Sequence, residues 1–350
     1  MMELNCLCDI YSGYAFKSFN DTSDGIPVIK IGNILSDGTI ELTDCVYTEE
    51  VPKEKYYSKK DDIYIALSGA TTGKIGVMQT DGLYVINQRV GIIRNKGKIP
   101  NDYLKYFLVS KSNQILKEAS GCAQPNISPK QISKYDISIQ TEEKMLLITQ
   151  QLKKIEVILQ NYRNQIDLLD ELVKARFVEM FGDMKPTVKL NKYIIELRAG
   201  KSLAGNEICK NKVLKTGAAT FGFFDKDQYK YYPKEYKPNP LHKVETGDVI
   251  ISRMNTPELV GACSYVYEAP DNTYYPDRLW KVIVNENTNP IFLWQLMWQQ
   301  EIRKQIKENS YGTSGTMNNI SKIKLLNINA IDVPISLQTG FEVQLVELVL

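Results

Sequence analysis

Apolar residues between Thr141 and Phe181 recur at alternating intervals of four and three. The positions are Ile148, Leu152, Ile155, Leu159, Tyr162, Ile166, Leu169 and Val173. This heptad spacing predicts a coiled-coil helix, with Thr141 suited to its N-cap and Gly182 to its end. A helix of about 40 residues is roughly 60 Å long, too long to bury its apolar face inside one small domain. The pattern therefore predicts a partner helix.

The segments before and after this helix, 1–140 and 187–336, show the same order of apolar runs. In each, a strand-like run that opens with aspartate is followed by a polar or glycine-rich loop. A second strand that opens with arginine comes next. These strands are predicted at 62–68 and 89–93 in the first segment, and at 248–253 and 278–283 in the second.

The remainder of each segment repeats as well. One amphipathic helix is predicted in each, after Pro100 and after Asn289. A loop, the tripeptide Asn-Ile-Ser and a closing strand follow, with the tripeptides at 126–128 and 319–321 and the strands at 135–139 and 331–335. The separation of matched residues changes only from 186 (Asp62 to Asp248) to 196 (Asp136 to Asp332). Matches in the same order with so little drift indicate a duplicated domain.

Composition limits the classes of protein that the sequence can encode. The 350 residues, 43% of them hydrophobic, suffice for two or three folded domains. No apolar run is long enough to cross a membrane, and Met1–Asn5 does not begin a signal peptide, so we expect a soluble, cytoplasmic protein. The six cysteines form no C-x-x-C pair and His242 is the single histidine. We therefore expect no metal site, no cofactor and no catalytic triad.

The order of these elements resembles that of the specificity (S) subunits of type I restriction-modification systems. The local sequences that carry the resemblance lie at 68–76, 175–182 and 247–253, together with the Asn-Ile-Ser tripeptides. The resemblance implies a mixed α/β fold in which two β-rich target recognition domains are joined by a long coiled-coil helix. It places these domains at 1–140 and 183–336, the central helix at 141–182, and the start of a second long helix at 337–350.

The resemblance also implies a function without catalysis by this chain. Each target recognition domain would recognise one half of a bipartite site in double-stranded DNA. The two long helices would pair and dock methyltransferase (M) subunits, and restriction/translocase (R) subunits would complete the complex. Only the first turns of the second helix precede Leu350. Its pairing with the first helix is open, because the partner can come from this chain or from another.

The loop Gly69–Ile75 is one candidate for contact with DNA. A P-loop has four residues between its glycines and Ser or Thr after Lys, whereas this loop has three residues and then Ile75, so it does not predict an ATP site. Backbone N–H groups, Thr71, Thr72 and Lys74 could instead meet a phosphate or a base edge. The alternative is a glycine-rich connection in a hairpin.

The segment 221–237 interleaves seven aromatic residues with four lysines, a composition that suits a nucleic-acid groove. The alternative is an exposed hairpin with one aromatic face against the core. Among the eight arginines, Arg89, Arg253 and Arg278 lie beside polar loops at repeated positions, and the arginine fork can bind two acceptors of guanine. For Arg253 the alternative is a structural pair with a carboxylate. The complete set of predicted DNA contacts is Lys30, Asn33, Ser68, Thr71, Thr72, Lys74, Gln88, Arg89, Lys215, Lys226, Lys230, Arg253, Asn255, Thr256 and Arg278.

Two other functions are compatible with parts of this pattern. A coiled-coil scaffold with two β-rich protein-binding modules would need no DNA surface. A fragment of a fused restriction-methyltransferase would need catalytic motifs, but Asn289-Pro290-Ile291-Phe292 lacks the second proline of the amino-methyltransferase signature. The sequence therefore favours a DNA-recognition subunit.

Overall fold

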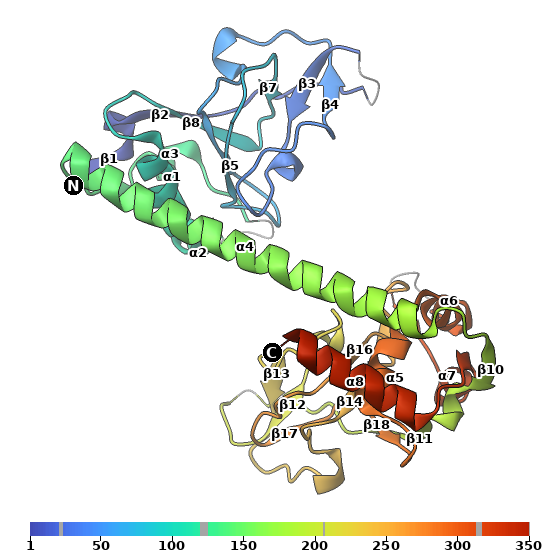
Figure 1. The fold of residues 1–350 in the computed structure, drawn as a ribbon. Coiled ribbons are helices and arrows are strands. Elements are labelled where there is room, and N and C mark those ends of the chain that lie inside the picture. The colour runs from blue at the N-terminus through green and yellow to red at the C-terminus, as the bar shows by residue number, and fades with distance from the viewer. Residues whose placement is uncertain (21–23, 120–124, 206, 313–316, 350) are drawn as a thin grey trace. The chain divides into compact units, whose positions relative to one another are not determined.

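The computed structural model describes residues 1–20, 24–119, 125–205, 207–312 and 317–349. They form two compact units, Met1–Arg163 and Asn164–Leu350. The chain passes from the first unit to the second within helix α4 (Glu142–Phe181), as Figure 1 shows. The long helix predicted from the heptads is thereby confirmed, and the Thr141 hydroxyl accepts a hydrogen bond from the Lys144 N–H at its start (3.4 Å). Cys122 and part of the loop predicted before Asn126 lie outside the described residues.

The first unit is built on a four-stranded antiparallel sheet, a three-stranded sheet and a terminal strand pair. The four-stranded sheet has the order β2 (Cys8–Ser12), β8 (Val90–Asn95), β5 (Ile63–Ala66) and β6 (Ile75–Val77). The three-stranded sheet has the order β4 (Val46–Thr48), β3 (Ile26–Ile29) and β7 (Val85–Ile86), and the pair joins β1 (Met2–Glu3) to β9 (Asp136–Ile137). All four residues of β5 are buried, which agrees with its continuous apolar run.

Helices α1 (Asn101–Ser110), α2 (Ser112–Ala119) and α3 (Pro129–Ile132) complete the first unit. The sequence predicted one helix where α1 and α2 lie. The structure divides it because the Lys111 N–H bonds to the carbonyl of Leu108, three residues back, and so tightens the turn (3.0 Å). Ser128 of the first Asn-Ile-Ser tripeptide caps α3, since its Oγ accepts from the N–H of Gln131 (3.3 Å).

The second unit repeats the two sheets and the terminal strand pair of the first. Its four-stranded sheet has the order β11 (Ile194–Ala199), β18 (Leu279–Val284), β14 (Val249–Ser252) and β16 (Cys263–Tyr265). Its three-stranded sheet has the order β13 (Tyr229–Tyr231), β12 (Lys212–Leu214) and β17 (Thr273–Tyr274). The terminal pair joins β10 (Pro186–Lys189) to β20 (Asn329–Ile331), and a further pair joins β15 (Met254–Asn255) to β19 (Asn318–Asn319).

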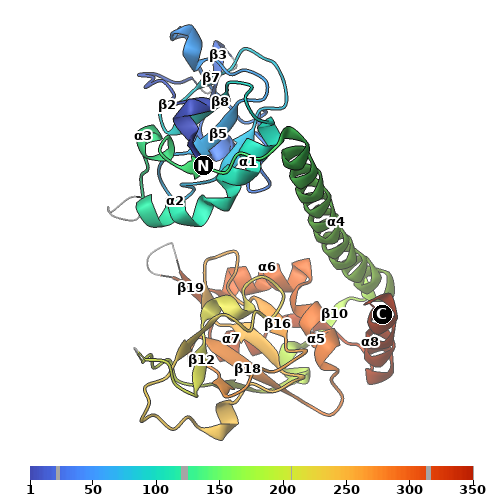
Figure 2. The same ribbon diagram turned by 90° about the vertical axis from the view of Figure 1, so that its left-hand side faces the viewer.

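The helices of the second unit follow the same order as those of the first (Figure 2). They are α5 (Pro290–Met297), α6 (Gln300–Asn309), α7 (Lys322–Leu326) and α8 (Ile335–Val349). Here too one predicted helix is two, divided where the Trp298 N–H bonds to the Gln295 carbonyl (3.2 Å). Asn289 caps α5, because its Oδ1 accepts from the N–H groups of Ile291 and Phe292 (3.0 and 3.1 Å).

The closing strand predicted at 331–335 is wrong in position. The strand is β20, which ends at Ile331, and α8 begins at Ile335. Pro334 explains the difference because proline cannot donate to a strand ladder but fits the first turn of a helix. Its carbonyl accepts from the N–H groups of Leu337 and Gln338 (3.0 and 3.2 Å).

Backbone hydrogen bonds align the two units residue by residue. The Leu67 N–H bonds to the carbonyl of Arg89 (2.9 Å), and the Arg253 N–H bonds to the carbonyl of Arg278 (3.0 Å). Leu67 and Arg253 therefore occupy equivalent positions, as do Arg89 and Arg278. The predicted duplication of a β-rich domain is confirmed by the shared strand order and by this register.

The apolar stripe of α4 has different surroundings along its length. Ile155, Leu159 and Tyr162 are 51%, 51% and 61% exposed, whereas Val173 is partly buried. Within the second unit, the ring of Phe341 on α8 lies 5.4 Å from that of Phe177 and 5.7 Å from that of Phe181. The predicted partner helix thus covers α4 at its C-terminal end, and the middle of the stripe is uncovered in the described part of the chain.

No helix among the described residues has the length and apolar character needed to cross a bilayer.

Candidate nucleic-acid interface

The loop between β5 and β6 is shaped by its glycines and by Thr72. Gly69 and Gly73 have φ values of +86° and +87°, a left-handed backbone that favours glycine. Thr72 is buried, and its hydroxyl donates to the carbonyl of Gly69 (2.7 Å). The loop is therefore a hairpin connection, and its contact with DNA stays a prediction. Thr72 maintains the shape of the loop, the Thr71 hydroxyl is buried without a hydrogen-bond partner among the described residues, and Lys74 remains partly exposed.

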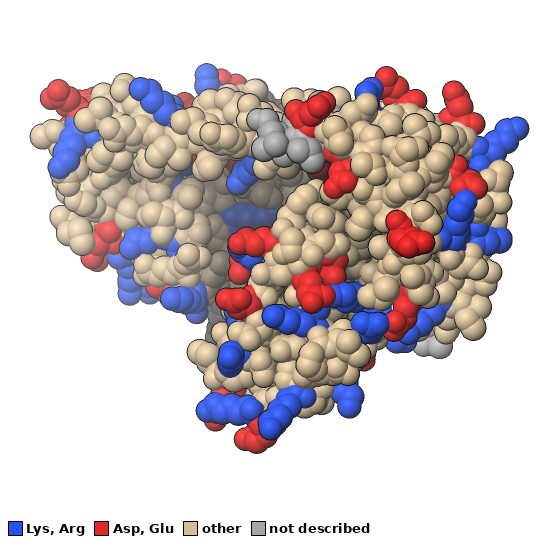
Figure 3. All heavy atoms as spheres, turned by 60° about the horizontal axis from the view of Figure 1, so that its bottom comes forward, with Lys and Arg blue, Asp and Glu red and all other residues tan. Residues whose placement is uncertain are grey.

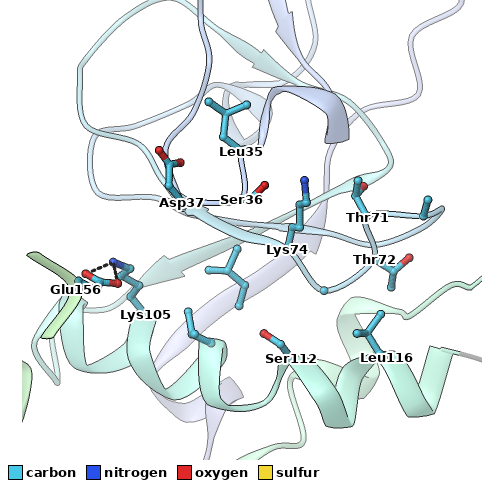
Figure 4. Close-up of a pocket in the computed structure, with 15 residues that line it drawn as sticks. Leu35, Ser36, Asp37, Thr71, Thr72, Lys74, Lys105, Ser112, Leu116 and Glu156 are labelled. Atoms are coloured by element: carbon cyan, nitrogen blue, oxygen red, sulfur yellow. Dashed lines mark hydrogen bonds and ion pairs between the residues drawn. The ribbon is translucent and has the colours of Figure 1, made fainter. Parts of the chain in front are cut away.

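Thr71 and Lys74 line a cavity of about 380 Å³, the loop cavity, opposite Leu35, Ser36 and Asp37. Figure 4 shows that their side chains point to one side of the loop and that of Thr72 points to the other. Both acids that line the loop cavity have other partners. The Asp37 carboxylate accepts from the N–H and hydroxyl of Thr39, bonds that lower its pKa, and Glu156 pairs with Lys105 (2.9 Å).

Asp37 and Glu156 are therefore not ion-paired with Lys74 in the described part of the chain. A half-buried ammonium without such a partner attracts an anion because its charge is incompletely screened. The position of Lys74 is compatible with contact to a phosphate.

A second cavity of about 550 Å³, the arginine cavity, brings three more predicted residues together. Ser68, Gln88 and Arg89 line it with Asn126 and Ser128, and none of its described lining residues is acidic. Gln88 and Arg89 are exposed, and Ser68 is bridged to Asn126 by backbone pairing. Asn126 was not among the predicted contacts, although its repetition in Asn-Ile-Ser was a signal. These side chains offer donors and acceptors of the kind that recognise base edges.

The predicted residues Lys30 and Asn33 lie at the short 3-10 helix η2 (Ile31–Asn33). Asn33 is buried, and its amide donates to the carbonyls of Glu41 (3.1 Å) and Asp44 (3.0 Å). The Asn33 Oδ1 accepts from the Lys30 N–H (2.9 Å), and the Lys30 ammonium lies 4.0 Å from the ring centre of Phe19. Asn33 thus holds the turn that presents Lys30, and its own polar atoms are used internally.

The second unit brings Arg253, Asn255 and Arg278 together at the equivalent end of its sheet. Arg253 is partly exposed, and its Nε donates to Oδ1 of Asn319 (3.4 Å) while its guanidinium lies 5.9 Å from the ring centre of Trp280. The observed partner is thus an amide oxygen rather than the carboxylate of the alternative interpretation. Arg278 is exposed, and β15 and β19 pair Met254 with Asn319.

Asn255 and Thr256 form the turn that follows β15. The Asn255 Oδ1 accepts from the Thr256 N–H (2.9 Å), and its Nδ2 donates to the hydroxyl of Thr220 (3.4 Å). Thr220 belongs to the segment after the short helix η5 (Thr216–Ala219). This contact joins the arginine-bearing end of the sheet to the segment 220–224.

The predicted lysines of the second unit are exposed at three separate places. Lys215 precedes η5, as Lys30 precedes η2, Lys226 pairs with Glu268 (3.2 Å), and Lys230 lies on β13. Tyr232 is buried, so the segment 221–237 has in part the aromatic face of a hairpin. Figure 3 shows basic and acidic side chains interspersed over the face in view, in keeping with a formal net charge of +2. A surface for DNA would therefore depend on local groups of basic residues rather than on the net charge of the whole chain.

Comparison with known proteins gives one family. Residues 1–174 match the family model described as the type I restriction modification DNA specificity domain. No curated protein matches the sequence of this chain. The S subunit of a type I restriction-modification system from M. genitalium is similar in fold, with a TM-score of 0.52 and 13% identity over 99% of this chain and 92% of that chain.

Two further solved structures are similar over 99% of this chain and 88% of theirs. One concerns complex assembly and conformational transition of the type I R-M system, at 17% identity and a TM-score of 0.44. The other is the HsdS subunit from Thermoanaerobacter tengcongensis, at 14% identity and a TM-score of 0.37.

The duplicated fold places exposed arginines and amide side chains at the same end of two similar sheets, an arrangement suited to recognition of a polar ligand. The family match gives the target of that recognition. The chain belongs to the DNA specificity family of type I restriction-modification systems, and its function is recognition of a DNA sequence. The scaffold without a DNA surface is not favoured.

Proposed function

We propose that the two repeated domains each recognise one half of a bipartite DNA site, with domains at 1–140 and 183–336. The helix at 141–182 would set the spacing between the half-sites, and 337–350 would begin the second long helix. The observation that carries this proposal is the shared strand order, which leaves polar side chains at the same end of both four-stranded sheets. Two copies of one recognition domain suit a DNA target that consists of two half-sites.

Base recognition falls to polar side chains that are at least partly exposed at this end of each sheet. In the first domain these are Ser68, Gln88 and Arg89 around the arginine cavity. In the second they are Arg253, Asn255, Thr256 and Arg278. An arginine fork suits guanine and an asparagine amide suits adenine. Phosphates would be held by a further set of cationic side chains, Lys30, Lys74, Lys215, Lys226 and Lys230.

The exposed stripe of α4 supports a role in assembly. Leu159 and Tyr162 are more than half exposed at positions whose heptad spacing suits a helical partner. We propose that this stripe docks methyltransferase (M) subunits, and that restriction/translocase (R) subunits complete the complex in the cytoplasm. Methyl transfer and cleavage would belong to those partners, and this chain would act by binding and positioning the DNA.

DNA binding by the purified full chain tests this function. Retention of duplexes from a random-sequence pool at low salt, lost as salt rises, is expected because released counterions favour binding. Lys74→Ala should weaken binding to all retained duplexes alike and lower the salt dependence by about one charge.

Lys60→Ala is the matched control, because this exposed lysine precedes β5 at the end of the strand remote from the loop cavity. No retention of any duplex by the wild-type chain would contradict the proposal. In cells that carry the complete system, mapping of the methylated motif should give two specified half-sites separated by unspecified bases.

A further inference from the structure

Two phenylalanines project from the second unit where a soluble surface is expected to be polar. Phe221 and Phe223 are 70% and 60% exposed, although each could remove a large apolar area from water if it were buried. They flank Gly222 in the segment 220–224, beside the candidate base-reading residues. An exposed aromatic pair next to a recognition surface indicates a partner that covers the rings.

The tip that carries these rings is held in place from behind. Gly222 has a φ of +88°, and its carbonyl accepts from Nε1 of Trp294 (3.0 Å). A Cβ added at Gly222 would lie 3.5 Å from the Trp298 ring, whose Nε1 donates to the Cys263 carbonyl (2.8 Å). Two tryptophans of the helical layer thus fix the backbone between the phenylalanines. The rings project from a braced turn rather than from a loose loop.

The braced turn is linked directly to the candidate base readers. Thr220 is buried next to the turn, and its hydroxyl accepts from the amide of Asn255 (3.4 Å). Asn255 is two residues from Arg253 on the same surface. On the other sides, the exposed Lys215 precedes η5 and the exposed Lys226 follows the turn. Exposed apolar rings bordered by amide, guanidinium and ammonium groups suit a partner that combines stacked rings with negative charge, as DNA does. They suit an apolar protein surface less well, because the bordering groups are polar or charged.

We propose that Phe221 and Phe223 form an aromatic wedge that inserts between base pairs of the half-site bound by the second unit. This inference rests on the proposed function and adds a mode of readout to it. Apolar side chains inserted between base steps unstack and kink a duplex, and the cost depends on the flexibility of the step. The wedge therefore gives preference for a deformable step that the polar side chains do not contact.

The first unit has no aromatic pair at the equivalent position. Lys30 and Lys215 both precede a short 3-10 helix of the three-stranded sheet, and the residues that follow those helices are 34–38 and 220–224. Leu35, Ser36, Asp37 and Gly38 occupy this place in the first unit, where they line the loop cavity. Leu35 is 37% exposed and aliphatic, so it cannot stack on a base as an aromatic ring does. Aromatic insertion is thus expected in one half-site only, which distinguishes it from a general distortion by the whole chain.

The test uses the purified full chain and duplexes enriched from a random-sequence pool. Permanganate, which oxidises unstacked thymines, is expected to mark one half-site in the wild-type complex. The double variant Phe221→Ala/Phe223→Ala should abolish this reactivity and weaken binding roughly tenfold, because base–aromatic stacking is lost. Phe223→Trp alone should retain the reactivity, since a larger flat ring can still insert.

Ile195→Ala is the matched control, because Ile195 is 66% exposed on β11 at the end of the sheet remote from Arg278. Tryptophan fluorescence verifies that each variant is folded, since Trp294 and Trp298 contact the turn. Unchanged affinity and reactivity in the double variant would overturn the wedge, as would wild-type complexes without a reactive thymine. Normal DNA binding with loss of a protein partner would reassign the rings to a protein interface. Failure of the wild-type chain to bind DNA would instead reject the proposed function.

Discussion

The two units have the same strand order but different chemistry at the end of the sheet where DNA is expected to bind. In the first unit, Leu67 is buried at the position that Arg253 occupies in the second. The turn after the 3-10 helix carries Ser36 and Asp37 in the first unit and Phe221 and Phe223 in the second. Both units carry an arginine at the position of Arg89 and Arg278, and the second unit adds Arg253 and the aromatic pair. The sheet therefore constrains where the proposed DNA-contacting residues lie, but it does not constrain which amino acids occupy those positions.

A second difference lies at the other end of the sheet, where each unit buries an aspartate. Asp62 is 2% exposed and accepts from Nε and Nη2 of Arg94 (2.7 and 2.6 Å). Asp248 is 8% exposed and pairs with Lys281 (2.9 Å). Both carboxylates also accept a backbone N–H three residues upstream, at Lys59 and Glu245. The turn is the same in both units, but its counter-charge comes from a different strand position.

The largest expected effect separates the units by stability. Phe341 is fully buried against Phe177 and Phe181, so Phe341→Ala should destabilise the second unit by about 3–5 kcal/mol. Ile148 on α4 lies in the first unit and is only partly buried, so Ile148→Ala should cost less. All three tryptophans lie in the second unit, so denaturation followed by tryptophan fluorescence reports on that unit. Equal midpoints for the two variants by this probe would contradict the packing.

The next effect compares the buried aspartates. Arg94→Met and Lys281→Met each leave a buried carboxylate without its cation and should cost about 3 kcal/mol in their own unit. Asp248 retains the hydroxyl of Tyr275 (3.0 Å), so the loss is expected to be smaller in the second unit. Urea denaturation measures the two losses of stability. Circular dichroism follows the unfolding of the whole chain, and tryptophan fluorescence follows that of the second unit.

The pH dependence of Lys281→Met provides a stricter test. Burial raises the pKa of Asp248, so the folded state binds a proton more tightly than the unfolded chain. Stability is then lost as pH rises from the ordinary carboxyl pKa through the raised one. Lys281 opposes the rise, and its removal extends this window upward. The deficit of Lys281→Met should therefore be smaller at about pH 5 than at about pH 8. A deficit that grows on acidification would contradict this assignment.

A smaller effect separates the units by base preference. Arg253→Ala should relax preference at one base pair by about 1–3 kcal/mol and leave the other half-site unchanged. Arg89→Ala should do the reverse, because it alters the arginine cavity of the first unit. Competition binding with duplexes varied in each half-site measures both. Uniform weakening at every base by Arg253→Ala would show that its role is anchoring rather than readout.

The smallest effect on stability is expected on the exposed stripe of α4. Leu159 is 51% exposed, so Leu159→Asp should change the free energy of unfolding by no more than about 0.5 kcal/mol. The same change puts a charge in the apolar stripe and should prevent assembly with methyltransferase subunits, because a buried unpaired charge is costly. Lys154→Asp is the control, because this exposed lysine lies about 140° around the helix from Leu159. Co-purification of the subunits gives the answer, and undiminished assembly of Leu159→Asp would reject the docking stripe.

Periodicity in the sequence determined the long helix, the duplication and the family resemblance. The heptads from Ile148 to Val173 and the paired strands around Asp62 and Asp248 are local patterns, and local patterns depend on nearest neighbours along the chain. The same reasoning failed at the ends of elements. A hydrogen bond three residues back divided each predicted helix in two, and Pro334 began a helix where a strand was predicted.

Which polar residues are available to a ligand depends on contacts that form only in the tertiary structure. Asn33 and Arg89 were both predicted DNA contacts, because each carries polar groups that can bind a base. The amide of Asn33, however, is saturated by two distant carbonyls, whereas the side chain of Arg89 is exposed. The braced turn at Gly222 likewise depends on tryptophans more than 70 residues away, since 72 residues separate it from Trp294. Hydrogen-bond satisfaction and bracing are set by groups that meet only after folding, and no pattern along the chain encodes which groups those are.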